Sequence, residues 1–324
     1  MTSQRAAIRA ARRPTCQSRE PLPAGLFTLP DPLRAEAWDP PVHHVRVALD
    51  TRLRSLLDHD PGARTGADIE DVHQMRVSVR RMRAALAAAR PVLDREWSDE
   101  LRAELGWLGR SLGPVRDLDV LLPRLRTLAE DLPVEERAAA QRLLAALDIE
   151  YAKAREDMLI ALGAPRYTAL LERLVDSVRL PLPTPTATQP QPELAELVRA
   201  QFRALRKGVG KAGAEPPDAV LHELRIRGKR LRYVGELAEP VLGKPVRRLL
   251  AATAGLQEVL GDHQDACVAQ HRIRELVAGL GEAADPGVVF AAGRLVEREH
   301  ARANHQRSLW RVAWRKVAQR AKHL

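Results

Sequence analysis

A basic motif that occurs twice restricts the fold of this chain more than any other feature of the sequence. Residues 73–83 read HQMRVSVRRMR and residues 222–232 read HELRIRGKRLR, so the histidine and most of the cations recur 149 residues later. A weaker pair follows in the same order, LGPVRDLD at 112–119 and LGDHQDAC at 260–267, 148 residues apart. Because two motifs keep nearly one offset, the sequence predicts an internal duplication and two similar halves related by a pseudo-twofold axis.

Prolines mark the expected boundaries of these halves. Residues 14–41 contain seven prolines, too many for regular secondary structure, so the folded part should begin near Val42. A second cluster, LPLPTPTATQPQP at 180–192, is typical of an extended linker. The expected organisation is a flexible tail rich in proline and arginine over 1–41, a first helical half over 42–179, a linker over 180–192 and a second helical half over 193–324.

The composition favours helices over sheet. Hydrophobic residues make up 45% of the 324 residues, but alanine and leucine dominate and aromatic residues contribute only 3%. Apolar residues recur with helical spacing between proline and glycine breaks, which predicts an all-α fold of two helical bundles. The expected helices are 42–59, 68–89, 94–112, 115–131, 134–162 and 166–178 in the first half, and 193–211, 218–238, 245–260, 263–280 and 286–320 in the second.

Charge and cysteine content narrow the class of partner and the compartment. The formal net charge of +10 indicates an anionic partner, such as a phosphate polymer, a nucleic acid or an acidic membrane surface. Two cysteines far apart, Cys16 and Cys267, exclude a disulfide scaffold and a zinc site built from several cysteines. No apolar run approaches the ~18–20 residues of a membrane span. We expect a cytoplasmic protein without membrane contact, although the arginine-rich first twenty residues also fit a targeting presequence.

The two basic motifs form charged stripes when they are placed on helices. In residues 73–83 the stripe covers an arc of about 80° beside an apolar arc. Like charges at these spacings repel by a few tenths of a kcal/mol per pair, and a face built only for solubility would mix the signs. Residues 73–83 contain no acid, and 222–232 contain only Glu223. This asymmetry favours an anion site over the alternative, a solvated face neutralised by neighbouring carboxylates. The stripes comprise His73, Arg76, Arg80 and Arg83 in the first copy and His222, Arg225, Lys229 and Arg232 in the second.

Three segments together resemble the CHAD family, the conserved histidine α-helical domain. They are VHQMRVSVRRMR, LGPVRDLDVLL and LHELRIRGKRLRYVGE, and the similarity extends over about residues 42–320. The resemblance implies two pseudo-symmetric bundles whose basic helices line a central groove that binds inorganic polyphosphate without catalysis. No E-x-E-x-K signature of an attached CYTH triphosphatase domain occurs, so this resembles a stand-alone CHAD protein. The second LG segment departs from the first at Gln264 and Ala266, where the first has Arg116 and Leu118.

On this interpretation polyphosphate is the partner, and association with polyphosphate granules would follow from it. Arginine offers a bidentate fork to phosphate oxygens, whereas lysine offers a point charge. His73 and His222 either donate to phosphate when protonated or fix the packing of helices. The expected ligand-binding residues are His73, Arg76, Arg80, Arg81, Arg83, His222, Arg225, Lys229, Arg230 and Arg232, with Arg203, Arg206, Lys207 and Arg116 as an extension of the groove.

Two other functions compete with this interpretation. Nucleic-acid binding requires similar charge, but recognition of single strands usually adds stacking aromatic residues, which neither stripe contains, so weak binding is expected. A metal-dependent phosphatase would need carboxylates that hold a divalent cation beside phosphate. Aspartates near a helix start often act as caps, and these could also pair with the basic stripe, so we expect no enzymatic activity and no cofactor. We also expect no metal site at His43 and His44, at the GDHQD segment of 261–265 or at His271. The candidate carboxylates are Asp117, Asp119, Asp262 and Asp265.

Overall fold

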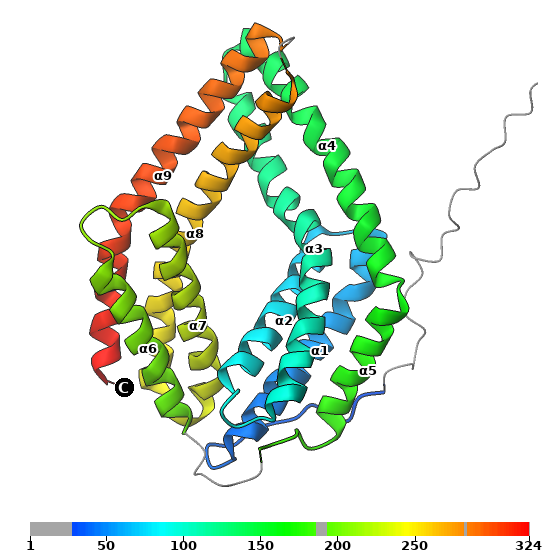
Figure 1. Cartoon of the computed structure of the whole chain (residues 1–324), viewed down its shortest axis with the longest axis vertical. Helices are drawn as coiled ribbons and strands as arrows, with labels where there is room; N and C mark the ends of the chain where they lie inside the picture. Colours follow the sequence, from blue (N-terminus) through cyan, green and yellow to red (C-terminus); the bar gives the residue numbers. More distant parts are fainter. Residues whose placement is uncertain (1–27, 186–192, 282–283, 324) are drawn as a thin grey trace, which may run out of the picture.

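The structure is a computed structural model that describes residues 28–185, 193–281 and 284–323. Within these ranges the chain forms nine α-helices and one short 3₁₀ turn but no strand (Figure 1), which confirms the predicted all-α class. None of these helices is long and apolar enough to cross a membrane. Residues 1–27 of the predicted tail and 186–192 of the predicted linker lie outside the described residues. The helices are α1 (Pro41–Thr65), α2 (Ile69–Ala88), α3 (Arg95–Glu130), α4 (Val134–Leu162), α5 (Pro165–Arg179), α6 (Leu194–Lys211), α7 (Asp218–Leu242), α8 (Lys244–Gly279) and α9 (Pro286–Arg320), followed by the turn Ala321–His323.

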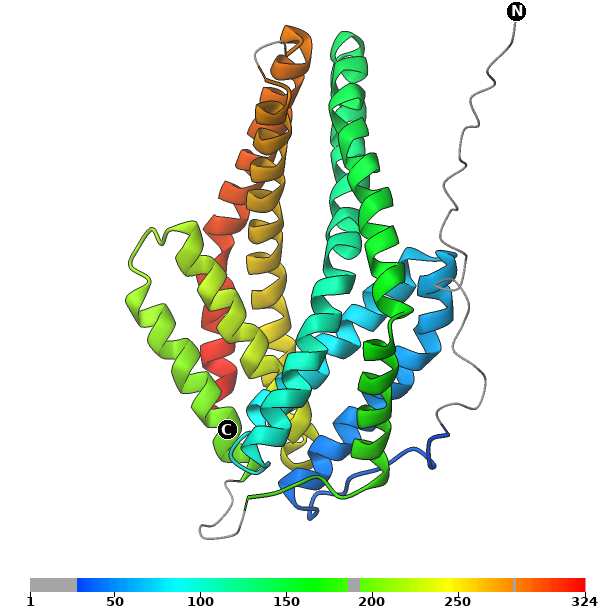
Figure 2. The ribbon, with the colours of Figure 1, turned by 45° about the vertical axis from the view of Figure 1, so that its right-hand side comes forward.

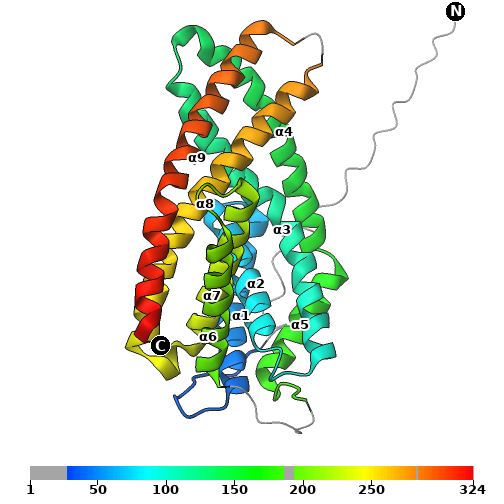
Figure 3. The same ribbon diagram turned by 60° about the vertical axis from the view of Figure 1, so that its left-hand side comes forward.

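Consecutive helices pack against one another in the same order in both halves, α1 to α4 in the first and α6 to α9 in the second. The long helices α3 and α4, and likewise α8 and α9, project as two pairs beyond the shorter helices (Figures 1 and 2). Helix α4 contacts α9, and the two basic helices α2 and α7 contact each other across the halves (Figure 3). This shared order supports the predicted duplication, which stays a prediction.

Two apolar cores lie one above the other along the long helices. The larger core contains residues of all nine helices, so the two halves share it. The smaller core joins the projecting parts of α3, α4, α8 and α9. Along α3 the larger core ends at Val115 and the smaller begins at Leu118; along α8 the larger ends at Leu260 and the smaller begins at Ala269. Between these two levels, α3 and α8 turn polar side chains toward the space between the halves.

Two of the predicted helix breaks are wrong. Helix α3 continues through Pro114 and α8 continues through Gly261, although both LG segments were expected to end a helix. A proline inside a helix costs ~3 kcal/mol because it removes a backbone hydrogen bond. Leu112 and Val115, both fully buried, continue the apolar stripe of α3 across this point, and burial of a leucine or valine contributes about 1.5–3 kcal/mol each. Two further helices run past an expected end, α1 through Pro61 to Thr65 and α7 through Pro240 to Leu242.

The apolar stripes of the two basic helices are buried, as their spacing predicts. In α2, Met75 and Met82 are fully buried and Val79 is 1% exposed. In α7, Leu224 and Leu231 take the equivalent positions and are also buried. Each helix is therefore anchored by one face, and this anchoring fixes the direction in which the basic face points.

Truncation of this anchor should destabilise the fold, whereas truncation of the adjacent charged side chain should not. We expect Met82→Ala to lower the free energy of unfolding by about 2–5 kcal/mol, because it leaves a cavity in the core. Arg83 is exposed, so Arg83→Ala is the matched control and should change stability by no more than about 0.5 kcal/mol. Urea unfolding followed by circular dichroism measures both values. Equal losses in the two variants would contradict the orientation of α2.

Candidate anion-binding cavity

A cavity of about 650 Å³ lies between α2, α3, α7 and α8, at the polar level between the two cores. Its volume is within the range of small-molecule sites in proteins. Both halves contribute cations to it, and Asp117, Glu150 and Asp265 are the carboxylates on its wall. No phenylalanine, tyrosine or tryptophan is among its described lining residues. The basic lining residues are His73, Arg76 and Arg80 of α2, Arg116 and Arg124 of α3, His222, Arg225 and Lys229 of α7, and Arg272 of α8.

The structure brings seven of the predicted ligand-binding residues to this one cavity. They come from the first two turns of each basic stripe, and Arg116 joins them from the first LG segment. The stripes lie on different halves of the sequence, and the contact between α2 and α7 places them on the same space. The seven are His73, Arg76, Arg80, Arg116, His222, Arg225 and Lys229.

The other predicted residues lie outside the cavity. Each stripe extends over about 15 Å of helix, since a helix rises 1.5 Å per residue, and the cavity covers only its beginning. Arg81 and Arg232 instead meet one carboxylate, Glu236, at 3.3 and 2.9 Å in the contact between α2 and α7. Arg83 is exposed beside Gly106 of α3. Arg230 is exposed as well. Three residues of the expected extension also lie outside the cavity: Arg203 pairs with Glu196, Arg206 lies over the ring of Phe202, and Lys207 is exposed.

Several cations of the cavity lack a neutralising partner. Arg76 pairs with Asp117 at 3.0 Å. Among the described residues, Arg80, Arg116, Arg225 and Lys229 have no carboxylate within ion-pair distance. The Nε atoms of Arg80 and Arg225, which come from different halves, are buried and form no hydrogen bond. The cavity therefore contains positive charge that no carboxylate of the described residues neutralises.

Crowding of these cations changes their protonation. Burial, together with the positive charges of Arg225 and Arg80, lowers the pKa of Lys229 to about 7. Burial also lowers the pKa of the His73 imidazole, with Arg116 as the next cause. An anion among these groups would stabilise their charged forms and raise both pKa values.

The two histidines have different surroundings. His222 Nδ1 donates to Gln264 Oε1 at 2.7 Å. Gln264 stands where the first LG segment has Arg116, so the departure noted in the sequence supplies an acceptor for a neutral or protonated imidazole. Near His73 the equivalent position is a cation, which repels its protonated form. The two halves therefore contribute matching cations to the cavity, but the residues that surround the two histidines differ.

Two arginines that the motif analysis missed, Arg124 and Arg272, also line the cavity. They lie 148 residues apart, the offset of the two LG segments, and this spacing was the signal that could have found them. Arg124 pairs with Glu299 of α9, while Arg272 pairs with Glu150 of α4. Each ion pair joins one half to the other, in the reciprocal manner that a pseudo-twofold axis would produce.

The four candidate aspartates lie inside helices rather than at helix starts, so the expectation that they cap helices is wrong. Asp262 pairs with Arg302 at 3.2 Å. Asp119 is buried beside Tyr151, and burial raises the pKa of its carboxyl. Asp117 and Asp265 line the cavity and counter its cations. The other alternative from the sequence, ion pairing with the basic stripe, holds for Asp117, which pairs with Arg76.

Comparison with protein families matches residues 47–274, from α1 to the last turns of α8, to the CHAD domain. The chain belongs to the CHAD domain family. The resemblance seen in the basic motifs is thereby confirmed. All lining residues of the cavity lie within the matched part of this CHAD domain.

Relatives of this CHAD protein are found among curated proteins and solved structures. The uncharacterized protein MT2285 of Mycobacterium tuberculosis is 29% identical over 289 residues, which cover 86% of this chain and 54% of the relative. The chain therefore spans about half the length of the curated relatives it matches. The CHAD domain from the plant Ricinus communis has a TM-score of 0.68 at 26% identity, covering 88% of this chain and 95% of that domain. PptA from Streptomyces chartreusis has a TM-score of 0.69 at 21% identity, covering 86% and 100%, and shows likeness of fold.

Proposed function

We propose that this CHAD protein binds inorganic polyphosphate in the cavity between α2, α3, α7 and α8, and does not hydrolyse it. The observation that carries the proposal is the convergence of unneutralised cations from both halves, above all Arg80, Arg225 and Lys229. A phosphate polymer bears negative charge along its whole length, and each cation that replaces a condensed counterion adds to affinity. Several fixed cations are therefore worth more to such a ligand than one closely fitting pocket.

The arrangement suits phosphate groups in chemical detail. Arg80 of α2 and Arg225 of α7 line the same cavity and come from different halves, so each guanidinium can take a separate phosphate. Arg76 is held by Asp117, whose side chain is 68% exposed, so phosphate can replace this carboxylate at little cost. Arg124 and Arg272 keep partners from the opposite half and would frame the ligand rather than form its main contacts.

Nucleic acid is the rival polyanion, and the lining favours polyphosphate over it. Proteins that bind single strands stack bases on aromatic side chains, each worth about 1–3 kcal/mol. The described lining of the cavity offers none. A location in the cytoplasm, on polyphosphate granules, follows from the proposal, and a fluorescent fusion of the chain would test it in cells that accumulate polyphosphate.

Removal of the unpartnered arginines should weaken binding of long-chain polyphosphate strongly. We expect Arg80→Ala/Arg225→Ala to lose at least tenfold in affinity, and its log–log salt slope to fall by about 1–2 because fewer counterions are released. The matched control Arg203→Ala/Arg206→Ala removes the same charge outside the cavity and should bind almost normally. Fluorescence or calorimetric titration at near-physiological salt measures this, with orthophosphate, single-stranded RNA and duplex DNA as competing ligands. Equal losses in both variants, or tighter binding of RNA than of polyphosphate, would contradict the proposal.

Binding should also depend on pH through Lys229. The charged groups around it are Arg225 on its own helix, Arg76 and Arg80 on α2, and Asp265 on α8. In the protein without ligand, Lys229 has a pKa of about 7. Below pH 7 its side chain is already charged, whereas above pH 7 the protein must take up a proton when it binds the polyanion. Affinity should therefore fall as pH rises from 7 to 9. Lys229→Arg, which stays charged, should flatten this dependence, and an unchanged pH profile in that variant would exclude Lys229 as its source.

The proposal excludes turnover of the polymer. Of the four aspartates, Asp119 is buried on Tyr151 and Asp262 pairs with Arg302, so they do not form one cluster around the cavity. We expect no release of phosphate from polyphosphate or nucleoside triphosphates with magnesium or manganese present. Asp117→Asn is the diagnostic variant, since Asp117 lines the cavity. Turnover by the unaltered chain that disappears in this variant would establish an enzyme instead.

A further inference from the structure

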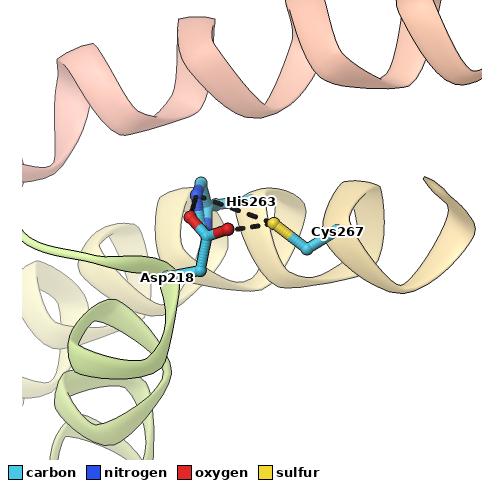
Figure 4. Close-up of side chains that lie close together, drawn as sticks. All are labelled: Asp218, His263 and Cys267. Atoms are coloured by element: carbon cyan, nitrogen blue, oxygen red, sulfur yellow. Dashed lines mark hydrogen bonds and ion pairs between the residues drawn. The ribbon is translucent and has the colours of Figure 1, made fainter. Parts of the chain in front are cut away.

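A second cluster of reactive side chains lies at the start of the basic helix α7, and the polyphosphate proposal does not use it. Asp218 is the first residue of α7, and His263 and Cys267 come from α8 (Figure 4). One ligand atom from each of the three residues lies within 4.8 Å of the other two. His263 is only 1% exposed, whereas the side chain of Asp218 is 58% exposed.

The spacing of these atoms fits the edges of a metal-centred tetrahedron. His263 Nε2 lies 3.2 Å from Asp218 Oδ1 and 3.8 Å from Cys267 Sγ. For zinc–ligand bonds of about 2.0–2.3 Å, tetrahedral geometry separates neighbouring ligand atoms by about 3.3–3.8 Å. His263 and Cys267 are four residues apart on one helix, so both side chains project from the same face. The third ligand, Asp218, comes from α7, so the three residues do not form a metal-binding motif that is local in the sequence.

We propose that Asp218, His263 and Cys267 bind a divalent cation of the zinc class, with solvent in the fourth position. One nitrogen, one sulfur and one oxygen ligand suit zinc or cobalt, whereas magnesium and calcium prefer oxygen alone. The exposed carboxylate leaves a path for the ion to enter. Binding releases the thiol proton of Cys267 to solvent, so that the sulfur bonds the metal as a thiolate.

The alternative is an ordinary network of polar contacts around a buried histidine. Arg307 of α9 pairs with Asp218 and also donates to the carbonyl of Pro216. Arg307 and His263 both approach Oδ1 of Asp218, and carboxylates that bind a metal are commonly hydrogen-bonded by a neighbouring group as well. The sulfur lies 3.8 and 4.0 Å from Nε2 and Nδ1 of His263, and it also hydrogen-bonds to Asp218 (Figure 4). These contacts bring the three side chains together, and a metal would bond the sulfur, the imidazole and the carboxylate at once.

A metal here would fix the first turn of α7 to α8. That helix carries His222, Arg225 and Lys229 into the cavity. Gln264 and Asp265 line the cavity from another face of α8, so the metal ligands and the cavity lining are separate sets of residues. The site would stabilise the position of the basic helix without taking part in binding the polyanion.

Cobalt titration of the full-length chain tests the proposal, because a cobalt–thiolate bond gives a charge-transfer band in the near ultraviolet. Cys16→Ala removes the other cysteine of the chain and serves as the matched control. We expect this variant to bind one cobalt ion with the band, zinc to displace the cobalt, and Cys267→Ser in the same background to lose the band. Asp218→Asn should keep a band but need at least tenfold more cobalt.

Folding and the proposed function are read out separately. Circular dichroism confirms that each variant is folded, and zinc should raise the melting temperature of Cys16→Ala more than that of Cys16→Ala/Cys267→Ser. Polyphosphate titration of the same samples shows whether the cavity is intact, whatever the metal result. Absence of the band in Cys16→Ala, or its persistence after Cys267→Ser, would overturn the metal site and leave the polyphosphate proposal untouched.

Discussion

Repulsion between cations of the two halves is the constraint on which the rest of this structure depends. Arg80 and Lys229 reach one space from α2 and α7, and their mutual charge together with burial lowers the pKa of Lys229 to about 7. Burial of apolar residues on the other face of each helix offsets that repulsion, since Met75 and Leu231 are fully buried there. Glu236 neutralises two other arginines where the helices touch, outside the cavity. Where α2 and α7 meet, Arg81 and Arg232 therefore have a carboxylate partner, whereas Arg80 and Lys229 at the cavity have none among the described residues.

Two equivalent ion pairs join the halves beside the cavity. Arg124 of the first half bonds Glu299 of the second, and Arg272 of the second half bonds Glu150 of the first. The arginines are 148 residues apart and the glutamates 149, the same offsets as the motifs. One pair joins α3 to α9 and the other joins α8 to α4. The two long helix pairs therefore cannot separate without leaving partly buried charges unpaired. The projecting parts of the two helix pairs are thus joined by these ion pairs and by the smaller apolar core, while the shorter helices share the larger core.

Much of this arrangement could be predicted from the sequence, because periodicity and repetition are local signals. The all-α class, the buried stripes and seven of the nine basic residues of the cavity follow from residue type and spacing. The continuity of α3 did not follow, because burial around Pro114 outweighs its preference to end a helix. The part of each stripe that lines the cavity was also beyond sequence patterns, since the crossing of α2 and α7 decides it. Arg232 lies on the same basic stripe as Lys229, but it pairs with Glu236 and does not line the cavity.

The placement of the cavity between equivalent parts of two halves also bears on what kind of ligand suits it. A small ligand with chemically different ends would use one half well and the other poorly. A polymer of identical units presents the same oxygens to Arg80 of α2 and to Arg225 of α7, which line the same cavity from different halves. The two halves differ in a further ring of contacts, where Gln264 bonds His222 but a cation lies near His73. Under the proposed function the matched arginines would hold successive phosphates, and the histidine surroundings would make one wall of the cavity more cationic than the other.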